Sequence, residues 1–294
     1  MDTFLGIVAI LLWSTNIAFA CGLAEQIGLL TSGAILFLLG GLLSLAYMVW
    51  QHKGLGFLKH SSKKYLIGCG ALFVINTISL QAAVGLSASR SQTLIVGLIN
   101  YLWPVLSLWF SLFILGKKAR FYLPVGIALA FGGMWLASTR GEVLNVQAVF
   151  QPANLVIYGF ALMAAVSWGL YSNLSRRWAG NQDSGSVPLF LLATGVLLGL
   201  TRLWISEPWA PAESIGLELA YMIVFPTMLA YIFWDSAMRK GRIILVVSLS
   251  YFIPLLSTVI SGLRLGVPLG VEIWTAALMI VAGAYICRTA VIET

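Results

Sequence analysis

Long apolar runs separated by short polar interruptions extend over the whole chain. Windows of about 20 residues predict apolar helices near residues 3–22, 30–50, 65–86, 91–113, 122–139, 154–175, 187–206, 216–237, 241–262 and 270–290. The runs lack the strict alternation of barrel strands, and lipid offers the backbone no hydrogen bonds, so helices are the expected form. The pattern predicts an all-α membrane protein with ten transmembrane helices.

Composition excludes a soluble enzyme. Hydrophobic residues make up 60% of the 294 positions and charged residues only 9%, against about 45–50% and 25% in an ordinary soluble domain. The mean hydropathy of +0.95 is too high for one protein core to hide the apolar side chains. Membrane lipid is therefore the expected solvent.

The net charge of +7 is explained by membrane topology rather than by a nucleic-acid partner. With the N-terminus inside, 13 of the 17 basic residues fall in the even-numbered loops and the C-terminal tail. The other side holds only Arg90, Arg140, Arg202 and Arg264. Because basic residues concentrate in cytoplasmic loops, we predict that both termini are cytoplasmic.

The first helix is expected to be retained rather than cleaved. Ala18-Phe19-Ala20 imitates the cleavage site of a secretory signal. A signal peptide begins with a positive region, however, and the residues before the first apolar run carry Asp2 and no Lys or Arg.

The two halves of the chain resemble each other. Residues 100–107 (N-Y-L-W-P-V-L-S) and 250–257 (S-Y-F-I-P-L-L-S) share Tyr, Pro, Leu and Ser at an offset of 150. The same offset relates Gly132-Gly133 to Ala282-Gly283. An offset of 155 relates Trp13 to Trp168.

This similarity predicts two five-helix repeats, residues 1–145 and residues 146–294. Five crossings are an odd number, so the second copy is expected to be inverted relative to the first. Inverted repeats around a site at the membrane midplane are typical of secondary transporters that work by alternating access. A duplicated passive scaffold is the alternative.

Three segments resemble a known family: Leu12-Trp13-Ser14-Thr15 and the two repeated stretches at 100–104 and 250–254. They are similar to the ten-helix (EamA-type) branch of the drug/metabolite transporter superfamily, and within it to the aromatic amino acid exporters. The resemblance covers the whole chain. It implies a monomeric exporter in the bacterial inner membrane that moves amino acids and similar metabolites outward through a central cavity.

In one respect the chain departs from this family. Many ten-helix relatives carry a Gly-Glu pair after the fourth span, whereas this chain has Gly116-Lys117 there and Gly266-Val267 at the repeat position. No role of that acid can be carried over.

Polar and aromatic side chains near the middle of the spans form the predicted substrate-binding cavity. They are Trp13, Asn16, Asn76, Gln81, Asn100, Tyr101, Trp168, Tyr171, Tyr231 and Tyr251. Amides and carbonyls suit the amino and carboxyl groups of a zwitterion, and rings suit an apolar side chain. For each asparagine, a hydrogen bond between helices is the alternative role.

Three prolines, Pro104, Pro226 and Pro254, are expected to act as hinges. A proline within a span frees the carbonyl four residues earlier, which is costly in lipid unless it faces protein or a wet cavity. Pro104 and Pro254 occupy equivalent positions and would free the carbonyls of Asn100 and Ser250. Kinks that only improve packing are the alternative.

No carboxylate is expected at the membrane midplane. Seven of the ten acidic residues lie in predicted loops or tails, Glu218, Asp235 and Glu272 lie near span ends, and both histidines lie in one loop. Proton-driven carriers usually keep a titratable group within the membrane. We therefore predict facilitated diffusion, with Asp235 as the acid best placed to reach inward. A proton-coupled metabolite or drug exporter of the same fold is the alternative.

No catalytic, cofactor or metal site is predicted. The three cysteines form no C-x-x-C pair. The loops offer neither an Asp-rich cluster nor a Gly-rich phosphate loop, which argues against a membrane-embedded transferase. A water-filled channel would need more charged or hydroxyl residues along one helical face. Gly195 and Gly199 form a G-x-x-x-G pattern, which we expect to serve packing within one chain rather than a dimer.

Overall fold

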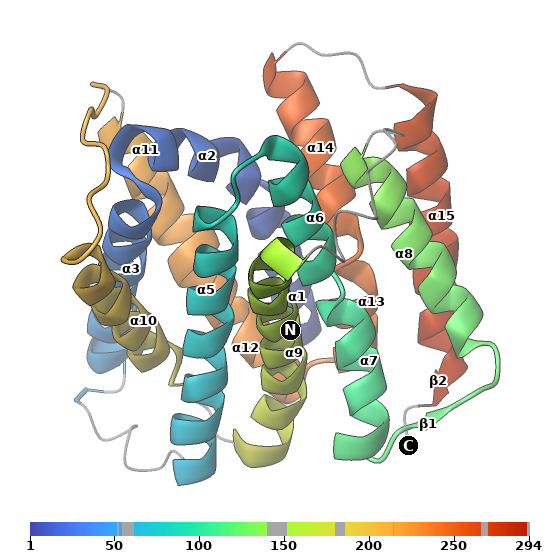
Figure 1. The fold of residues 1–294 in the computed structure, drawn as a ribbon. Coiled ribbons are helices and arrows are strands. Elements are labelled where there is room, and N and C mark those ends of the chain that lie inside the picture. The colour runs from blue at the N-terminus through green and yellow to red at the C-terminus, as the bar shows by residue number, and fades with distance from the viewer. Residues whose placement is uncertain are drawn as a thin grey trace.

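The structure, a computed structural model, describes residues 1–51, 53–54, 62–139, 152–179, 186–213, 215–265 and 270–292, and it is almost entirely helical (Figure 1). The first half contains α1 (Asp2–Ser14), α2 (Asn16–Ile27), α3 (Leu29–Gln51), the π-helical segment η1 (Lys64–Cys69), α5 (Gly70–Gly85), α6 (Arg90–Asn100), α7 (Trp103–Ile114) and α8 (Leu123–Thr139). The second half contains α9 (Pro152–Ala179), α10 (Val187–Arg202), α11 (Ile215–Met222), the π-helical segment η3 (Ile223–Leu229), α12 (Ala230–Lys240), α13 (Ile243–Leu249), α14 (Phe252–Leu265) and α15 (Val271–Ala290). Two short strands, β1 (Lys118–Ala119) and β2 (Val291–Ile292), pair antiparallel.

Apolar helices long enough to cross a bilayer confirm a multi-pass membrane protein. Seven such stretches occur in the described part of the chain: Leu29–Gln51, Lys64–Gly85, Gln92–Ile114, Asn154–Ala179, Ile215–Lys240, Ile243–Ile260 and Val271–Ala290. Three further apolar helices are shorter: Asp2–Ser14, Leu123–Thr139 and Val187–Arg202. Each predicted span overlaps one of these helices, while the number of ten crossings stays a prediction.

Two of the predicted spans are broken at related positions. α6 ends at Asn100 and α7 begins at Trp103, while α13 ends at Leu249 and α14 begins at Phe252. A proline stands in the first turn of each following helix, Pro104 in α7 and Pro254 in α14. This position suits proline because the first turn of a helix needs no N–H donor.

The carbonyl of Ser250 is not free, contrary to the prediction from Pro254. It accepts a hydrogen bond from the Ile253 N–H at 3.0 Å. The carbonyl that a continuous α-helix would have left unpaired is therefore hydrogen-bonded within a tight turn. Pro226 lies inside η3, where the wider π-helical turn accommodates the missing donor.

The first predicted span is also interrupted, which the apolar pattern did not indicate. α1 ends at Ser14 and α2 begins at Asn16. The hydroxyls of Ser14 and Thr15 donate to the carbonyls of Ile10 and Leu12, both at 2.7 Å. Such hydrogen bonds from Ser and Thr to the preceding turn bend helices.

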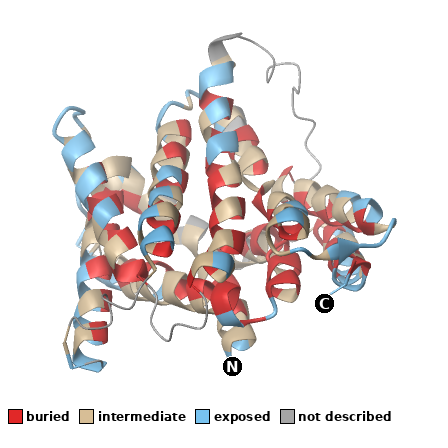
Figure 2. Cartoon of the chain, turned by 90° about the horizontal axis from the view of Figure 1, so that it is seen from below, coloured by how far each residue is buried: buried red, intermediate tan, exposed pale blue. Residues whose placement is uncertain are grey.

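Helices from opposite halves of the chain pack against one another. α3 packs on α10, α8 on α15, α5 on α9 and α1 on α12. Buried residues occupy the inward faces of these helices and exposed residues the periphery (Figure 2).

Glycines allow several of these close approaches. A methyl group on Gly133 of α8 would lie 2.8 Å from the carbonyl oxygen of Ala276 on α15, and one on Gly283 would collide with the backbone of Ala130. A methyl group on Gly195 would lie 2.6 Å from the amide nitrogen of Leu38 on α3. Gly195 therefore serves packing within the chain.

The N-terminal residues and β2, the last described segment, lie at one face of the bundle together with several basic segments. The Asp2 carboxylate accepts a hydrogen bond from the Ser236 hydroxyl at 2.8 Å, and the Thr3 hydroxyl accepts one from the Arg242 N–H at 3.0 Å. At the other terminus, β2 pairs with β1, which follows Lys117. We call this face, with residues 1–3, 117–120, 239–242 and 291–292, the basic face.

Candidate substrate site

Aromatic side chains from both halves of the chain meet in one cluster. The ring of Trp13 on α1 lies 5.7 Å from that of Trp168 on α9 and 5.3 Å from that of Tyr231 on α12, measured between centroids. Trp168 also stacks on Tyr171 at 4.9 Å and meets Phe73 of α5 edge-on at 5.8 Å. We call Trp13, Phe73, Trp168, Tyr171, Tyr231 and Trp234 the aromatic cluster.

The members of the aromatic cluster differ in accessibility. Trp168, Tyr171 and Trp234 are buried, whereas Trp13 and Tyr231 are only partly buried. The indole N–H of Trp13 donates to the carbonyl of Pro226 at 3.0 Å. This bond holds the ring against η3 and leaves part of the apolar ring surface accessible, which is how tryptophan commonly serves in binding sites.

A buried charged network adjoins the aromatic cluster on the side of the basic face. The Asp235 carboxylate accepts hydrogen bonds from the hydroxyls of Tyr65 at 2.7 Å and Tyr171 at 2.8 Å. Its second oxygen pairs with the guanidinium of Arg239 at 2.7 Å, and the side chains of Asp235 and Arg239 are 1% and 4% exposed. Ser186 donates its N–H to the Tyr65 hydroxyl. The Asp235 network, defined as Tyr65, Tyr171, Asp235 and Arg239, thus joins η1, α9 and α12.

Asp235 lies farther from the end of its helix than the sequence prediction placed it. The predicted eighth span ended at 237, whereas α12 continues to Lys240. Besides Arg239, the carboxylate is bound by Tyr65 of η1 and Tyr171 of α9, and neither of these partners lies in a loop.

Two predicted site residues carry buried polar atoms without a partner. Among the described residues, neither the side-chain oxygen of Asn100 nor the hydroxyl of Tyr251 has a hydrogen-bond partner. Both residues lie at the helix breaks, Asn100 at the end of α6 and Tyr251 between α13 and α14. Buried polar atoms are normally paired, so unpaired atoms at equivalent breaks are candidates for contact with water or ligand.

The remaining predicted residues lie around the aromatic cluster or away from it. Tyr101 packs both against the core that contains the aromatic cluster and against the core between α8 and α15 that holds Tyr251. Asn76 is buried and donates to the Ala164 carbonyl at 2.8 Å, the contact expected of a link between helices. Gln81 has its amide beside Gly33 of α3, and Asn16 is half-buried at the start of α2.

The sequence prediction did not include Phe73, Trp234 or Tyr65. Trp234 follows Tyr231 by three residues, a spacing that places both on one helical face and could have revealed it. The spacing of four between Asp235 and Arg239 is a similar local signal. Tyr65 is 170 residues from Asp235, so only the fold reveals their contact.

No three His, Cys, Asp or Glu side chains come together to hold a metal ion within the part of the chain that the structure describes. The two cysteines whose side chains are described, Cys69 and Cys287, are buried and unlinked.

Comparison with known proteins gives the chain a family. Residues 3–139 and 155–289 each match the EamA-like transporter family. The chain is 28% identical over 291 residues to the aromatic amino acid exporter YddG of Salmonella typhimurium, covering 97% of this chain and 96% of the relative. It is 31% identical over 261 residues to YddG of Ancylobacter novellus, covering 88% and 86%. A solved crystal structure matches with a TM-score of 0.83 at 28% identity, covering 97% of this chain and 96% of the other.

These matches confirm the expectation of a membrane transporter and exclude the alternative of a transferase. With both halves of its sequence matched, the chain belongs to the EamA-like transporter family.

Proposed function

We propose that this protein is a secondary transporter of the bacterial inner membrane that exports aromatic and other mainly apolar amino acids, or similar small metabolites, by alternating access. The aromatic cluster carries the proposal, because it draws Trp13 and Phe73 from the first half and Trp168 and Tyr231 from the second. Trp13 and Trp168 are repeat equivalents and lie in contact. The names of the relatives support the substrate class.

The proposed site suits a zwitterion with an apolar body. Aromatic rings pack against the substrate side chain, while the polar side chains at the helix breaks bind its amino and carboxyl groups. The partly accessible rings of Trp13 and Tyr231 and the unpaired oxygen of Asn100 are the first candidates for contact. Neutral partners bind a substrate weakly enough to release it, which transport requires.

Helix packing supports two inverted repeats. In two such repeats, α1 corresponds to α9 and α5 corresponds to α12. The contact of α5 with α9 then corresponds to the contact of α12 with α1, and both contacts occur. At an offset of 150, Gly133 corresponds to Gly283 and Ala130 corresponds to Ile280. Gly133 lies against Ile280 and Gly283 lies against Ala130, so these two contacts also correspond. We place the repeats at residues 1–145 and 146–294, with a boundary that lies outside the described residues.

We propose that the Asp235 network closes one end of the transport pathway. It ties η1 and α9 to α12 on the side of the basic face, and Arg176 of α9 adds a hydrogen bond to the Met238 carbonyl at 2.9 Å. To open this end, α12 must separate from α9 and η1. In this proposal the structure represents a state closed at the basic face, and we assign that face to the cytoplasm from the distribution of Lys and Arg.

We propose that transport is facilitated diffusion. The observation that favours the alternative, proton coupling, is the buried carboxylate of Asp235. In this structure the carboxylate is bound by Arg239 and by the hydroxyls of Tyr65 and Tyr171, so we assign it a role in linking helices.

Transport into liposomes distinguishes the two mechanisms. We expect labelled phenylalanine to equilibrate to the same level with and without an imposed pH gradient. Uphill accumulation that depends on the gradient would establish proton coupling instead.

A competition panel tests the substrate class. The twenty common amino acids, each added in excess, compete with labelled tryptophan for uptake into liposomes that contain the purified protein. We expect aromatic amino acids, leucine and methionine to compete strongly, and aspartate and lysine weakly. Competition by charged amino acids equal to that by aromatic ones would overturn the proposed recognition.

A further inference from the structure

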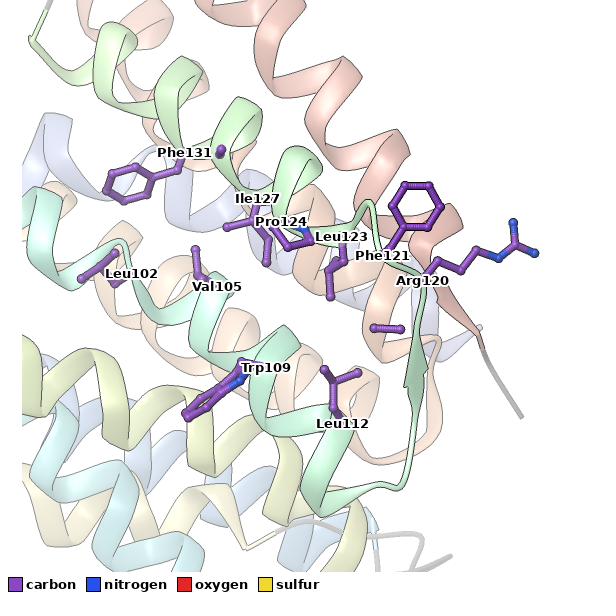
Figure 3. A pocket seen from close by; sticks show the side chains of 12 residues that line it. Leu102, Val105, Trp109, Leu112, Arg120, Phe121, Leu123, Pro124, Ile127 and Phe131 are labelled. Atoms are coloured by element: carbon purple, nitrogen blue, oxygen red, sulfur yellow. The ribbon is translucent and has the colours of Figure 1, made fainter.

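A hollow on the outer surface of the bundle lies between α7 and α8. These helices diverge and leave a groove of about 550 Å³, shown in Figure 3. Val105 and Trp109 line it from α7, and Ile127 and Phe131 line it from α8. Arg120 is the only charged residue in the lining.

The groove has a charged end and an apolar end. Arg120 and Phe121 lie at the end next to β1, on the basic face, while Leu102 and Phe131 lie at the opposite end (Figure 3). The guanidinium of Arg120 points away from the apolar side chains (Figure 3). The segment that joins α7 to α8 also contains Lys117 and Lys118 and no acidic residue.

No carboxylate among the described residues pairs with Arg120. Its guanidinium donates to the Tyr122 hydroxyl at 3.2 Å, and neither of the ion pairs found among the described residues involves it. Within the described part of the chain, this guanidinium is therefore available to an anionic group at the rim of the groove.

The groove opens toward lipid. Trp109 is 53% exposed, and Phe113, Phe121 and Val125 nearby are 69%, 94% and 60% exposed. In a multi-pass membrane protein, large apolar side chains with this exposure face the bilayer, and aromatic ones concentrate at its surface.

We propose that this groove is a binding site for one anionic phospholipid. An acyl chain lies along the apolar lining between α7 and α8, and Arg120 binds the headgroup phosphate at the basic face. Basic pockets between helices at the membrane surface select anionic headgroups in this way. The bound chain reaches Leu102, which lies within the break between α6 and α7. The site depends on neither the transported substrate nor its coupling.

Photochemical labelling tests the proposal on the purified full-length protein. The protein is placed in phosphatidylcholine nanodiscs that contain a trace of phosphatidylglycerol with a photoreactive group in one acyl chain, and labelled peptides are mapped by mass spectrometry. A phosphatidylcholine probe with the same chain serves for comparison. We expect labels within residues 102–112 and 123–131, about fivefold more from the anionic probe.

Three variants sharpen the test. Arg120→Gln is expected to reduce anionic labelling of the groove to the level of the phosphatidylcholine probe. Arg242→Gln removes an exposed arginine from the same face and should change nothing, because the hydrogen bond of Arg242 to Thr3 is made by its backbone N–H, which the substitution keeps. Ala128→Trp, at an exposed position in the lining, fills the groove and should abolish labelling by both probes without disturbing the core.

Two results would overturn the proposal. One is equal labelling of the groove by both probes with no effect of Arg120→Gln, which would leave only ordinary lipid contact. The other is labelling that maps outside α7 and α8.

Discussion

At the scale of single residues, the site contains polar groups that are satisfied by the protein and polar groups that are not. The amide of Asn76 is paired with the Ala164 carbonyl, whereas the side-chain oxygen of Asn100 has no partner among the described residues. A paired group contributes to folding, while an unpaired buried group is expected to serve function or to bind water. The structure thus suggests different roles for two asparagines that were both predicted from the sequence to line the substrate-binding cavity.

The contrast predicts different effects for two alanine substitutions. Asn100→Ala removes an unpaired oxygen, so we expect transport to fall severalfold with little change in stability. Asn76→Ala breaks a buried hydrogen bond and should lower the free energy of unfolding by about 1 kcal/mol. Uptake into liposomes and thermal unfolding in detergent measure the two effects. If Asn100→Ala lost stability as Asn76→Ala does, or transported normally, its assignment to the site would be wrong.

The ion pair between Asp235 and Arg239 gives a second prediction at this scale. Asp235→Asn leaves the guanidinium of Arg239 buried without its counter-charge, and we expect a loss of about 3–5 kcal/mol in stability. The double variant Asp235→Asn, Arg239→Met removes both charges and should recover most of this loss. Denaturation of the two purified variants checks the prediction. An equal loss in the single and double variants would show that the charges are not coupled.

At the scale of helices, contact between the repeats depends on small residues. Gly133→Ala places a methyl group 2.8 Å from the Ala276 carbonyl oxygen, so α8 and α15 must move apart. We expect a lower unfolding temperature. Gly159→Ala on α9 is the matched control, because a methyl group there meets nothing within 4 Å. The control should be neutral or stabilising by up to about 1 kcal/mol, since alanine favours helix. Equal effects of the two substitutions would contradict the packing described here.

The helices were predictable because lipid imposes a minimum length of apolar sequence on each crossing. The breaks near Pro104 and Pro254 were predictable too, since proline acts locally on the helix. The interruption at Thr15 was not, because it arises from hydroxyl groups that bond to their own backbone.

The candidate site was predictable only in part. Repeat symmetry related Trp13 to Trp168, and both joined the aromatic cluster. No local signal pointed to the contact of Tyr65 with Asp235, which depends on how η1 packs against α12. Contacts of this kind are formed by tertiary packing, so the pattern of residues along the chain does not predict them.

At the scale of the whole molecule, helices from both halves of the chain meet in the aromatic cluster and in the Asp235 network. The contacts between α5 and α9 and between α1 and α12 bring the aromatic rings together, and the Asp235 network ties η1 and α9 to α12 on the side of the basic face. A carrier of this design exposes its site to one side of the membrane at a time. Substrate on the far side therefore accelerates the return of the loaded protein, which a channel cannot show.

Counterflow measures this property directly. Liposomes that contain the purified protein are loaded with unlabelled tryptophan, and the entry of external labelled tryptophan is followed against empty liposomes. The proposed mechanism predicts faster entry and a transient accumulation of label above the external concentration in loaded liposomes. Entry at the same rate in loaded and empty liposomes, without transient accumulation, would contradict it.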